Sequence, residues 1–270
     1  MVPLEERFPR PSVMGVVNVT PDSFSDGGVN LRAEDAVAAA RRMVEEGAAI
    51  VDVGGESTRP GSDGVSLDEE LRRVVPVLEA LERQVPVSID TAKAEVARRA
   101  LALGAELVND VTALRGDLNL AEVVASSGAY LCLMHMQGEP RTMQHDPQYG
   151  DVASEVAAFL EERLRFAVAA GIPEERICLD PGFGFGKTVE QNFELLARLR
   201  EVVALGCPVL VGLSRKRSLG RILGDPEATT GPLPASLAAA VQAYERGATI
   251  FRVHDVREHV EALTVASAVG

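Results

Sequence analysis

The sequence contains no tryptophan, few cysteines and no long apolar run. The three cysteines, Cys132, Cys178 and Cys207, lie in apolar stretches without the C-x-x-C spacing of many metal and redox sites. Such residues are typical of buried thiols in a reducing compartment. No apolar run approaches the roughly 20 residues of a transmembrane helix, and the first ten residues lack the apolar core of a signal peptide. We therefore expect a cytoplasmic protein.

Positive charge is also scarce. Lysine and arginine total 27 against 40 acidic residues, and the formal net charge is −13. Because an acidic surface repels polyanions, we expect neither nucleic acid nor an anionic membrane as the main partner. A small anionic substrate would need only a local cluster of cations. Just three of the basic residues are lysines, Lys93, Lys187 and Lys216, which suggests that some of these positions require an ammonium group.

The chain alternates between two kinds of segment. Short apolar, β-branched runs predict strands at 13–17, 49–53, 85–89, 106–108, 129–134, 176–179, 207–213 and 248–253. Stretches with helical periodicity predict helices at 33–46, 67–83, 92–103, 119–126, 151–170, 189–203, 233–246 and 256–268. Strict alternation of strand and helix is typical of parallel β–α–β units.

The connections between these segments differ in length and composition. Six of the seven helix-to-strand joints carry glycine, and the joint at Gln84 does not; the glycines are Gly47, Gly104, Gly128, Gly171, Gly206 and Gly247. Long strand-to-helix loops, such as 135–150 and 214–232, place the working face at the carboxyl ends of the strands. Eight units in 270 residues predict one (β/α)₈ TIM barrel domain over 1–270, with an open doubly wound sheet as the alternative.

The first polar residues after the strands are of mixed chemical type: Asn18, Glu56, Asp90, Asn109, Asp110, His135, Asp180, Ser214, Arg215, Arg252 and His254. Any one of them could simply solvate a strand end. A set that mixes acids, amides and cations instead favours a binding site. Arg252 and His254 are two residues apart on one strand, so their side chains point to the same side, and the pair could bind an anion.

Motifs for other nucleotide sites are incomplete. The stretch 182–188 ends in Gly-Lys-Thr, but Pro181 stands where a phosphate-binding P-loop requires glycine. Lys187 stands where a dinucleotide-binding loop needs its third glycine, so both interpretations fail. The loop could still bring its backbone and Phe185 to a ligand.

The histidines show no zinc-site spacing. We expect His135 to be a packed, hydrogen-bonded residue at a strand end. We expect His145 and His259 to be exposed.

The loops at the strand ends resemble those of the dihydropteroate synthase family, in order and over nearly the whole chain. The matching stretches are MGVVNVTPDSFSDGG (14–28), GGESTRPG (54–61), SIDT (88–91), VNDVTALRGD (108–117), LMHMQGEP (133–140), DPGFGFGKT (180–188), GLSRKR (212–217) and RVHDV (252–256). The resemblance implies a TIM-barrel transferase of folate biosynthesis, usually a homodimer, that uses Mg²⁺ and is a sulfonamide target. It implies condensation of 6-hydroxymethyl-7,8-dihydropterin diphosphate with p-aminobenzoate to give 7,8-dihydropteroate and pyrophosphate.

The resemblance also implies roles for the pterin-facing residues. Asp180 corresponds to the carboxylate that accepts two hydrogen bonds from the aminopyrimidine edge, with Asp90 and Asn109 completing that edge. Paired N–H donors suit a carboxylate, and a wrong heterocycle would leave these groups unpaired. Lys216 corresponds to the lysine against the pterin oxygen and ring nitrogen.

The other matching residues divide among the diphosphate, the metal and the second substrate. In the resemblance Asn18, Thr58, Arg252 and His254 hold the diphosphate, Asn18 also contacts Mg²⁺, Arg59 and Pro60 belong to the second loop, and Phe185 lines the p-aminobenzoate pocket. Many relatives carry serine directly after the lysine, where it helps hold the benzoate carboxylate. Here Arg217 precedes Ser218, although a helix beginning there could still offer backbone N–H groups.

The implied reaction is substitution at the exocyclic methylene carbon of the pterin. Mg²⁺, Arg252 and His254 would stabilise charge on the departing diphosphate. The neutral arylamine attacks a cation-like carbon and needs no strong base. We therefore assign Lys216, Arg252, His254 and Asp90 as catalytic residues, with loops 20–28 and 57–66 closing over the site.

Two alternatives remain. A pterin methyltransferase that uses methyltetrahydrofolate has a similar barrel, but it would have no use for a diphosphate site or a benzoate pocket. A catalytically inactive relative would be expected to have lost Lys216, Arg252 or Asp180, and all three are present.

Overall fold

The computed structural model describes residues 2–20, 29–58, 62–81, 83–139 and 141–269. Arg59, Pro60 and most of the 20–28 loop lie outside this range. Eight strands are present near their predicted places: β1 (Ser12–Asn18), β2 (Ile50–Gly54), β3 (Val87–Asp90), β4 (Leu107–Asp110), β5 (Tyr130–Met134), β6 (Ile177–Asp180), β7 (Leu210–Val211) and β8 (Ile250–Val253). Of these, β7 is much shorter than predicted.

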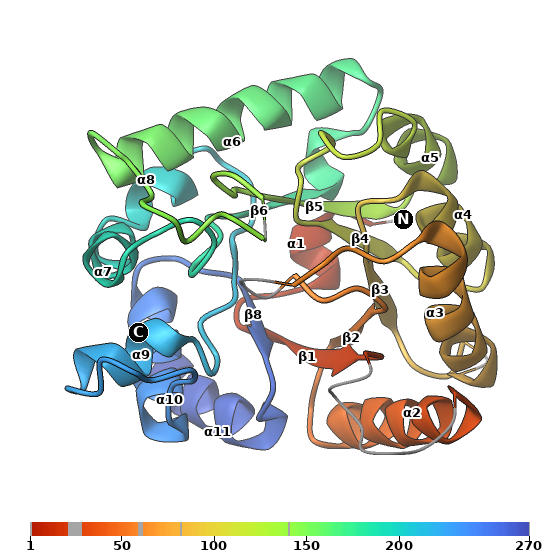
Figure 1. Cartoon of the computed structure of the whole chain (residues 1–270), viewed down its shortest axis with the longest axis horizontal. Helices are drawn as coiled ribbons and strands as arrows, with labels where there is room; N and C mark the ends of the chain where they lie inside the picture. Colours follow the sequence, from red (N-terminus) through yellow and green to blue (C-terminus); the bar gives the residue numbers. More distant parts are fainter. Residues whose placement is uncertain (1, 21–28, 59–61, 82, 140, 270) are drawn as a thin grey trace.

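The strands form a parallel barrel (Figure 1). Their order is β6-β5-β4-β3-β2-β1-β8-β7, so chain neighbours pair throughout, and β1 pairs with β8 through Met14 and Arg252. A single bridge between Leu179 and Val209 joins β6 to the β7 side. A doubly wound sheet would reverse its strand order at a switch point. The (β/α)₈ barrel is therefore confirmed.

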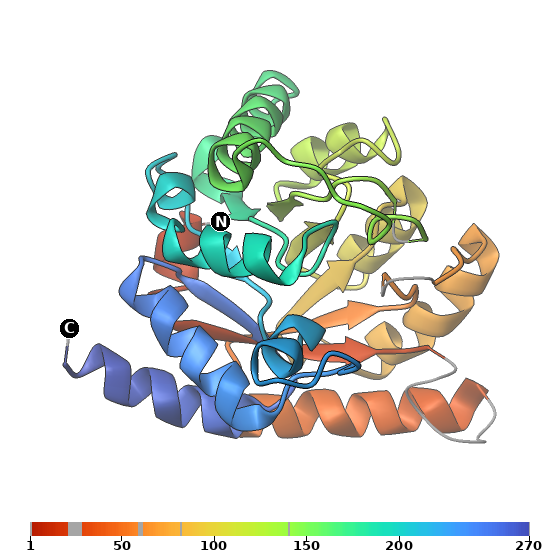
Figure 2. The same cartoon turned by 60° about the vertical axis from the view of Figure 1, so that its left-hand side comes forward.

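The helices lie outside the strands: α2 (Val29–Glu45), α3 (Leu67–Leu81), α4 (Ala94–Ala102), α5 (Leu120–Ser127), α6 (Val152–Ala169), α7 (Val189–Ala197), α8 (Arg200–Val203), α9 (Arg217–Ile222), α10 (Leu233–Glu245) and α11 (Val256–Ser267). Helices α10 and α11 pack together on the β8–β1 flank (Figure 2). None of the helices in the described part of the chain combines the length and apolar composition that a bilayer crossing requires.

One predicted helix is divided. The prediction of a continuous helix over 189–203 was wrong, because α7 ends at Ala197 and α8 begins at Arg200. Between them Arg198 has a φ of −103° and a ψ of 19°, outside helical values, and its guanidinium bonds the carboxylates of Asp151, Glu194 and Glu201. Sequence periodicity cannot detect this break, because Leu199 and Val202 are both buried as a continuous helix would predict.

The helix-to-strand joints follow the glycine prediction. All six predicted glycines have positive φ angles, as a left-handed helix C-terminus requires. At the joint without glycine, Arg83 adopts that conformation with a φ of 58°. This conformation is uncommon for a residue with a side chain.

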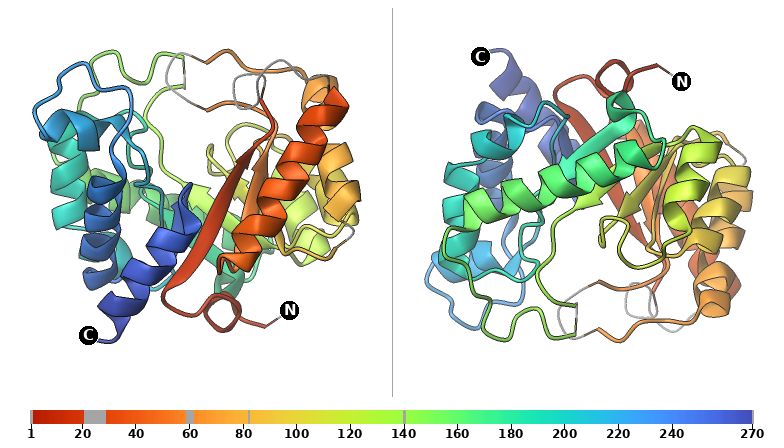
Figure 3. Two further views of the ribbon diagram at one scale, coloured as in Figure 1. Left: turned by 90° about the horizontal axis from the view of Figure 1, so that it is seen from below. Right: turned by 90° about the horizontal axis from the view of Figure 1, so that it is seen from above.

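The amino-terminal end of the barrel is closed by a short helix, α1 (Leu4–Arg7). Leu4 and Phe8 are fully buried, and the Phe8 ring meets the Tyr130 ring edge-on at 5.8 Å between centroids. The Tyr130 hydroxyl donates to the Val2 carbonyl at 2.8 Å. Figure 3 shows α1 and both termini at the end of the barrel opposite the long strand-to-helix loops. The polar strand ends therefore form the open end.

Candidate active site

Four polar side chains from β2, β3, β4 and β8 meet inside the barrel, and we call them the Arg252 cluster: Asp52, Asp90, Asn109 and Arg252. Arg252 donates from Nε to Asp52 Oδ2 at 2.7 Å and from Nη2 to Asp90 Oδ2 at 2.9 Å. Asn109 Nδ2 donates to Asp52 Oδ2 at 2.9 Å. Three residues predicted separately from the sequence are thus joined by hydrogen bonds.

Asp52 was not among the predicted residues. Its side chain is fully buried in β2, and it bonds both Arg252 and Asn109. A signal for it exists in the sequence, because an acid in the middle of the apolar strand Ile50–Gly54 is seldom buried without a partner. The prediction considered only residues after each strand and so passed over it.

The Arg252 cluster contains acceptors that face no donor. Asp52 Oδ1 and Asn109 Oδ1 are buried, and neither has a hydrogen-bond partner among the residues described. Buried polar atoms in folded proteins are normally paired. Asp52 and Asn109 therefore each carry an oxygen acceptor that a ligand with N–H donors could satisfy.

Burial changes the acid–base properties of the cluster. It raises the pKa of Asp90 to about 7, with Arg252 acting to lower it and Asp52 acting to raise it. Burial disfavours the charged form of Arg252, but the neighbouring carboxylates outweigh it and raise the pKa of the guanidinium. The cluster therefore holds one permanent positive charge among carboxyl groups, of which Asp90 titrates near neutral pH.

Asp180 lies at the end of β6 and is 5% exposed. Its Oδ1 accepts from the Gly182 backbone N–H at 2.7 Å, which orients the carboxylate. Burial raises the pKa of Asp180 to about 6, although that hydrogen bond and the charges of Lys216 and Arg252 act to lower it. At pH 7 the carboxylate is ionised and can accept paired hydrogen bonds.

Lys216 and Phe185 lie against each other at the mouth of the barrel. Lys216 Nζ is 4.2 Å from the centroid of the Phe185 ring, within range of a cation–π contact. Burial lowers the pKa of Lys216 to about 8, while Asp180 acts to raise it. Phe185 also packs on a small apolar cluster that includes Met134 and Met136. The two residues present a charged tip beside an apolar surface.

The loop after β6 owes its shape to glycine. Gly182, Gly184 and Gly186 have positive φ angles of 69°, 80° and 64°. A Cβ on Gly182 would lie 1.9 Å from the His135 carbonyl oxygen, so no other residue fits there. This loop binds its own lysine, because Lys187 Nζ contacts the Gly182 and Phe185 carbonyls. The sequence-based rejection of a phosphate loop agrees with this arrangement.

The histidines fall into three environments. His135 is buried and its Nδ1 lies 2.9 Å from Lys187 Nζ, as predicted for a packed, hydrogen-bonded residue. His145 is exposed, as expected. The prediction that His259 is exposed was wrong, because His259 is fully buried in the first turn of α11, with Nδ1 2.6 Å from the Asp255 carbonyl oxygen. This burial depends on how α11 packs in the folded chain, which a short-range pattern does not reveal.

His254 is held by Ser214. The Ser214 hydroxyl accepts from the His254 backbone N–H at 3.2 Å and lies 3.2 Å from its Nδ1. Burial lowers the pKa of His254 to about 3, and the charges of Arg252 and Arg215 act in the same direction. The imidazole is therefore neutral in the free protein, in a surrounding of positive charge that would favour an anion.

Other strand-end residues have structural contacts. Asp110 accepts hydrogen bonds from Thr112 and Leu114 in the following turn, and so it stabilises a loop. Lys93 forms ion pairs with Glu56 and with the fully buried Glu70. Neither Glu70 nor Lys93 was predicted as part of the site.

The remaining predicted residues are placed as follows. Asn18 and Thr58 lie at or just after the ends of β1 and β2, half-buried at the open end. Asn18 is in register with Gly54 of β2. Arg59 and Pro60 lie outside the described residues. Between positions 2 and 269, the residues described contain no group of three acidic, histidine or cysteine side chains that could hold a metal ion by themselves.

Known proteins resemble this chain over almost its full length. Residues 14–254 match the family model for pterin-binding enzymes. The dihydropteroate synthase of Escherichia coli K12 is 50% identical over 262 residues, covering 96% of this chain and 91% of the relative. The structure of Xanthomonas albilineans dihydropteroate synthase with 4-aminobenzoic acid has a TM-score of 0.89 and 51% identity, covering 97% and 93% of the two chains. The same enzyme with 7,8-dihydropteroate has a TM-score of 0.85 and 49% identity, covering 97% and 94%.

Proposed function

Because the chain belongs to the dihydropteroate synthases, a family of pterin-binding enzymes, we propose that the Arg252 cluster, Asp180 and Lys216 together hold its pterin substrate. The chain is a transferase of folate biosynthesis. It condenses 6-hydroxymethyl-7,8-dihydropterin diphosphate with p-aminobenzoate and releases pyrophosphate. The alternative, a pterin methyltransferase, is not supported, because these similar proteins are dihydropteroate synthases.

One observation supports the pterin assignment most directly. Asp52 Oδ1 and Asn109 Oδ1 are buried acceptors without partners in the described part of the structure, and Asp180 adds an oriented carboxylate. The aminopyrimidine edge of a pterin carries adjacent N–H donors that would satisfy such acceptors. Lys216 would donate to the pterin oxygen, which complements the carboxylates.

The diphosphate would lie against the positive side of the site. Arg252 in β8 carries a fixed charge, and His254 directly follows the end of that strand. A bound diphosphate would raise the pKa of His254 and favour its protonated form. As the carbon–oxygen bond breaks, both groups would stabilise the negative charge that develops on the leaving pyrophosphate. Thr58 and Asn18 would add neutral donors from neighbouring strand ends.

The donor set also fits Mg²⁺. Asn18 offers a single amide oxygen, and Mg²⁺ commonly keeps several waters and takes its other ligands from substrate phosphates. A protein site with one oxygen ligand is therefore sufficient when the diphosphate is present. When bound, the ion would add further neutralisation of charge on the diphosphate.

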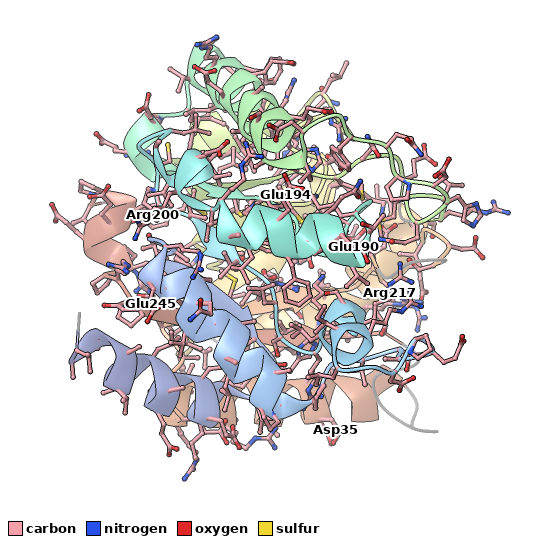
Figure 4. All side chains as sticks on the ribbon, turned by 90° about the vertical axis from the view of Figure 1, so that its left-hand side faces the viewer. Asp35, Glu190, Glu194, Arg200, Arg217 and Glu245 are labelled. Atoms are coloured by element: carbon pink, nitrogen blue, oxygen red, sulfur yellow. The ribbon has the colours of Figure 1, made fainter. Side chains whose placement is uncertain are left out.

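The second substrate would lie over Phe185. Its ring and the neighbouring methionines provide an apolar surface, and the arylamine nitrogen attacks the methylene carbon as a neutral group, so that a carbon–nitrogen bond forms and a proton leaves the nitrogen. Ser218 is buried, whereas Arg217 is half-buried at the start of α9. Figure 4 shows Arg217 toward the same end of the molecule as Glu190, at the start of α7. We assign the benzoate carboxylate to Arg217, which follows Lys216 at the start of α9.

The diphosphate assignment is tested by comparing two ligands. Arg252→Ala and His254→Ala should weaken binding of the diphosphate substrate far more than binding of a pterin without the leaving group, measured by calorimetry. His254→Ala is the cleaner variant, because Arg252 also bonds Asp52 and Asp90. Equal losses for both ligands would exclude these residues from the diphosphate site. Wild-type protein must also release pyrophosphate and dihydropteroate together, which an inactive relative would not.

We also propose that the chain is a cytoplasmic homodimer. Phe166 and Val168 on α6 are each about two-fifths exposed and offer apolar surface for a contact between subunits. The free, buried cysteines are consistent with a reducing compartment. Sedimentation of the wild type tests the dimer, and a monomeric wild type would exclude it. The double variant Phe166→Ser with Val168→Ser tests whether α6 forms the contact, because it should then be a monomer.

A further inference from the structure

A lysine and a histidine are buried together beneath the loop after β6, and the reaction proposed above uses neither. Lys187 is 2% exposed and His135 is 6% exposed. Lys187 Nζ lies 2.9 Å from His135 Nδ1, 2.9 Å from the Gly182 carbonyl oxygen and 3.1 Å from the Phe185 carbonyl oxygen. A buried ammonium is costly unless its donors are satisfied.

The three contacts match the three donors of an ammonium group. Because a charged lysine can only donate, His135 Nδ1 must accept and the imidazole must be neutral. Burial together with the charges of Lys187 and Arg115 lowers the pKa of His135 to about 2, which agrees with this assignment. Burial lowers the pKa of Lys187 itself to about 7, while Asp180 acts to raise it. The ammonium group of Lys187 thus lies in surroundings that disfavour its charged form.

The contacts join two loops of the barrel mouth. His135 follows β5, whereas Gly182 and Phe185 belong to the loop after β6. That loop alternates glycine with phenylalanine, and its glycines have a large conformational freedom that must be restricted from outside. Gln144 Nε2 bonds the Gly184 carbonyl at 2.8 Å and the Tyr149 hydroxyl bonds that of Gly186 at 2.9 Å. Lys187 Nζ bonds two further carbonyls of the loop, those of Gly182 and Phe185.

We propose that Lys187 is a positioning residue that fixes the Phe185 ring beneath Lys216 and thereby sets the affinity for p-aminobenzoate. The carbonyl that Lys187 holds belongs to the residue whose ring lies 4.2 Å from Lys216 Nζ. Without the ammonium, the backbone of Phe185 can rotate and the ring leaves that place. The inference rests on the proposed position of the second substrate over Phe185.

Lys187→Met tests the role, because methionine fills most of the lysine volume without donors. We expect the KM for p-aminobenzoate to rise about 10-fold or more, which corresponds to about 1.4 kcal/mol of binding free energy. The KM for the pterin diphosphate should change by less than about 3-fold, because no hydrogen bond that the structure describes joins Lys187 to Asp180 or to the Arg252 cluster. The charge of Lys187 also acts on the Asp180 carboxylate less strongly than the charges of Lys216 and Arg252 do. Lys187→Gln, which retains two donors on a shorter chain, should recover part of the loss.

A destabilised control separates positioning from general damage. Leu199 is fully buried between α7 and α8, away from the loop, so Leu199→Ala should lower the melting temperature and leave both KM values unchanged. If Lys187→Met raises both KM values equally, or neither, the positioning role is wrong. If Lys187→Met does not fold, the two KM values of Lys187→Gln are compared in the same way and decide whether Lys187 has the positioning role.

Phe185→Ala distinguishes this inference from the proposed function. If Phe185→Ala leaves the KM for p-aminobenzoate unchanged, the second substrate does not lie over Phe185 and the pocket assignment fails. If Phe185→Ala raises that KM and Lys187→Met does not, the pocket stands and the role of Lys187 alone is overturned.

Discussion

Replacing Lys216 with arginine should inactivate the enzyme while leaving its fold intact. The exchange keeps the positive charge but substitutes a planar guanidinium for a compact ammonium. Lys216 packs closely on its neighbours, because a Cβ added to Gly184 would lie 3.1 Å from its Cδ and its Nζ is 4.2 Å from the centroid of the Phe185 ring. The larger head group must therefore enter the space proposed for the substrates.

The expected loss follows from that displacement. A shift of about 1 Å costs on the order of 10²-fold in rate, which corresponds to about 2.7 kcal/mol of transition-state stabilisation. A second effect concerns pH. Burial lowers the pKa of Lys216 to about 8, whereas a guanidinium stays charged throughout this range. The part of the activity profile that depends on Lys216 deprotonation near pH 8 should disappear in the variant.

The assay is steady-state turnover, followed by pyrophosphate release at saturating p-aminobenzoate, with the melting temperature measured in parallel. Arg165→Lys is the matched control, because Arg165 is exposed on α6 and pairs with Glu161. It should change stability by no more than about 0.5 kcal/mol and leave turnover unaltered. If the Lys216→Arg variant turns over within a few-fold of wild type, Lys216 is a generic cation, and the argument from lysine scarcity fails with it.

Three further outcomes are expected. Asp180→Asn should weaken a pterin analogue by roughly 3–5 kcal/mol in calorimetry, because the amide presents an N–H to the ligand's donors; wild-type affinity would remove Asp180 from the site. In wild type, where burial raises the pKa of Asp180 to about 6, affinity should fall by about tenfold per pH unit below that value, since the protonated carboxyl loses an acceptor; a flat profile between pH 7 and 5 would contradict this. Phe8→Ala should destabilise the fold by about 3–5 kcal/mol in denaturant unfolding, because its ring packs on Tyr130 at the closed end; an unchanged midpoint would show that α1 does not seal the barrel.

Local patterns in the sequence were sufficient for the fold. The β-branched runs predicted all eight strands, and the glycines at six joints marked the ends of helices where a left-handed residue is needed. These features depend on neighbours a few residues away, which the sequence displays directly. The length of the loops also identified the open end of the barrel, because the short joints cannot hold a site.

Partners far apart in the chain were decided only by the tertiary structure. Arg252 was predicted to face a diphosphate, but its carboxylate partners Asp52 and Asp90 lie about 200 and 162 positions away, and strand periodicity does not show which side chains meet. Lys187 is one of only three lysines in the sequence, yet its burial against His135 depends on how two loops pack. Charges in the middle of strands and beneath loops acquire their pKa values and partners from burial. Barrel closure brings eight strand ends together, and the sequence alone cannot give the distances at which their side chains meet.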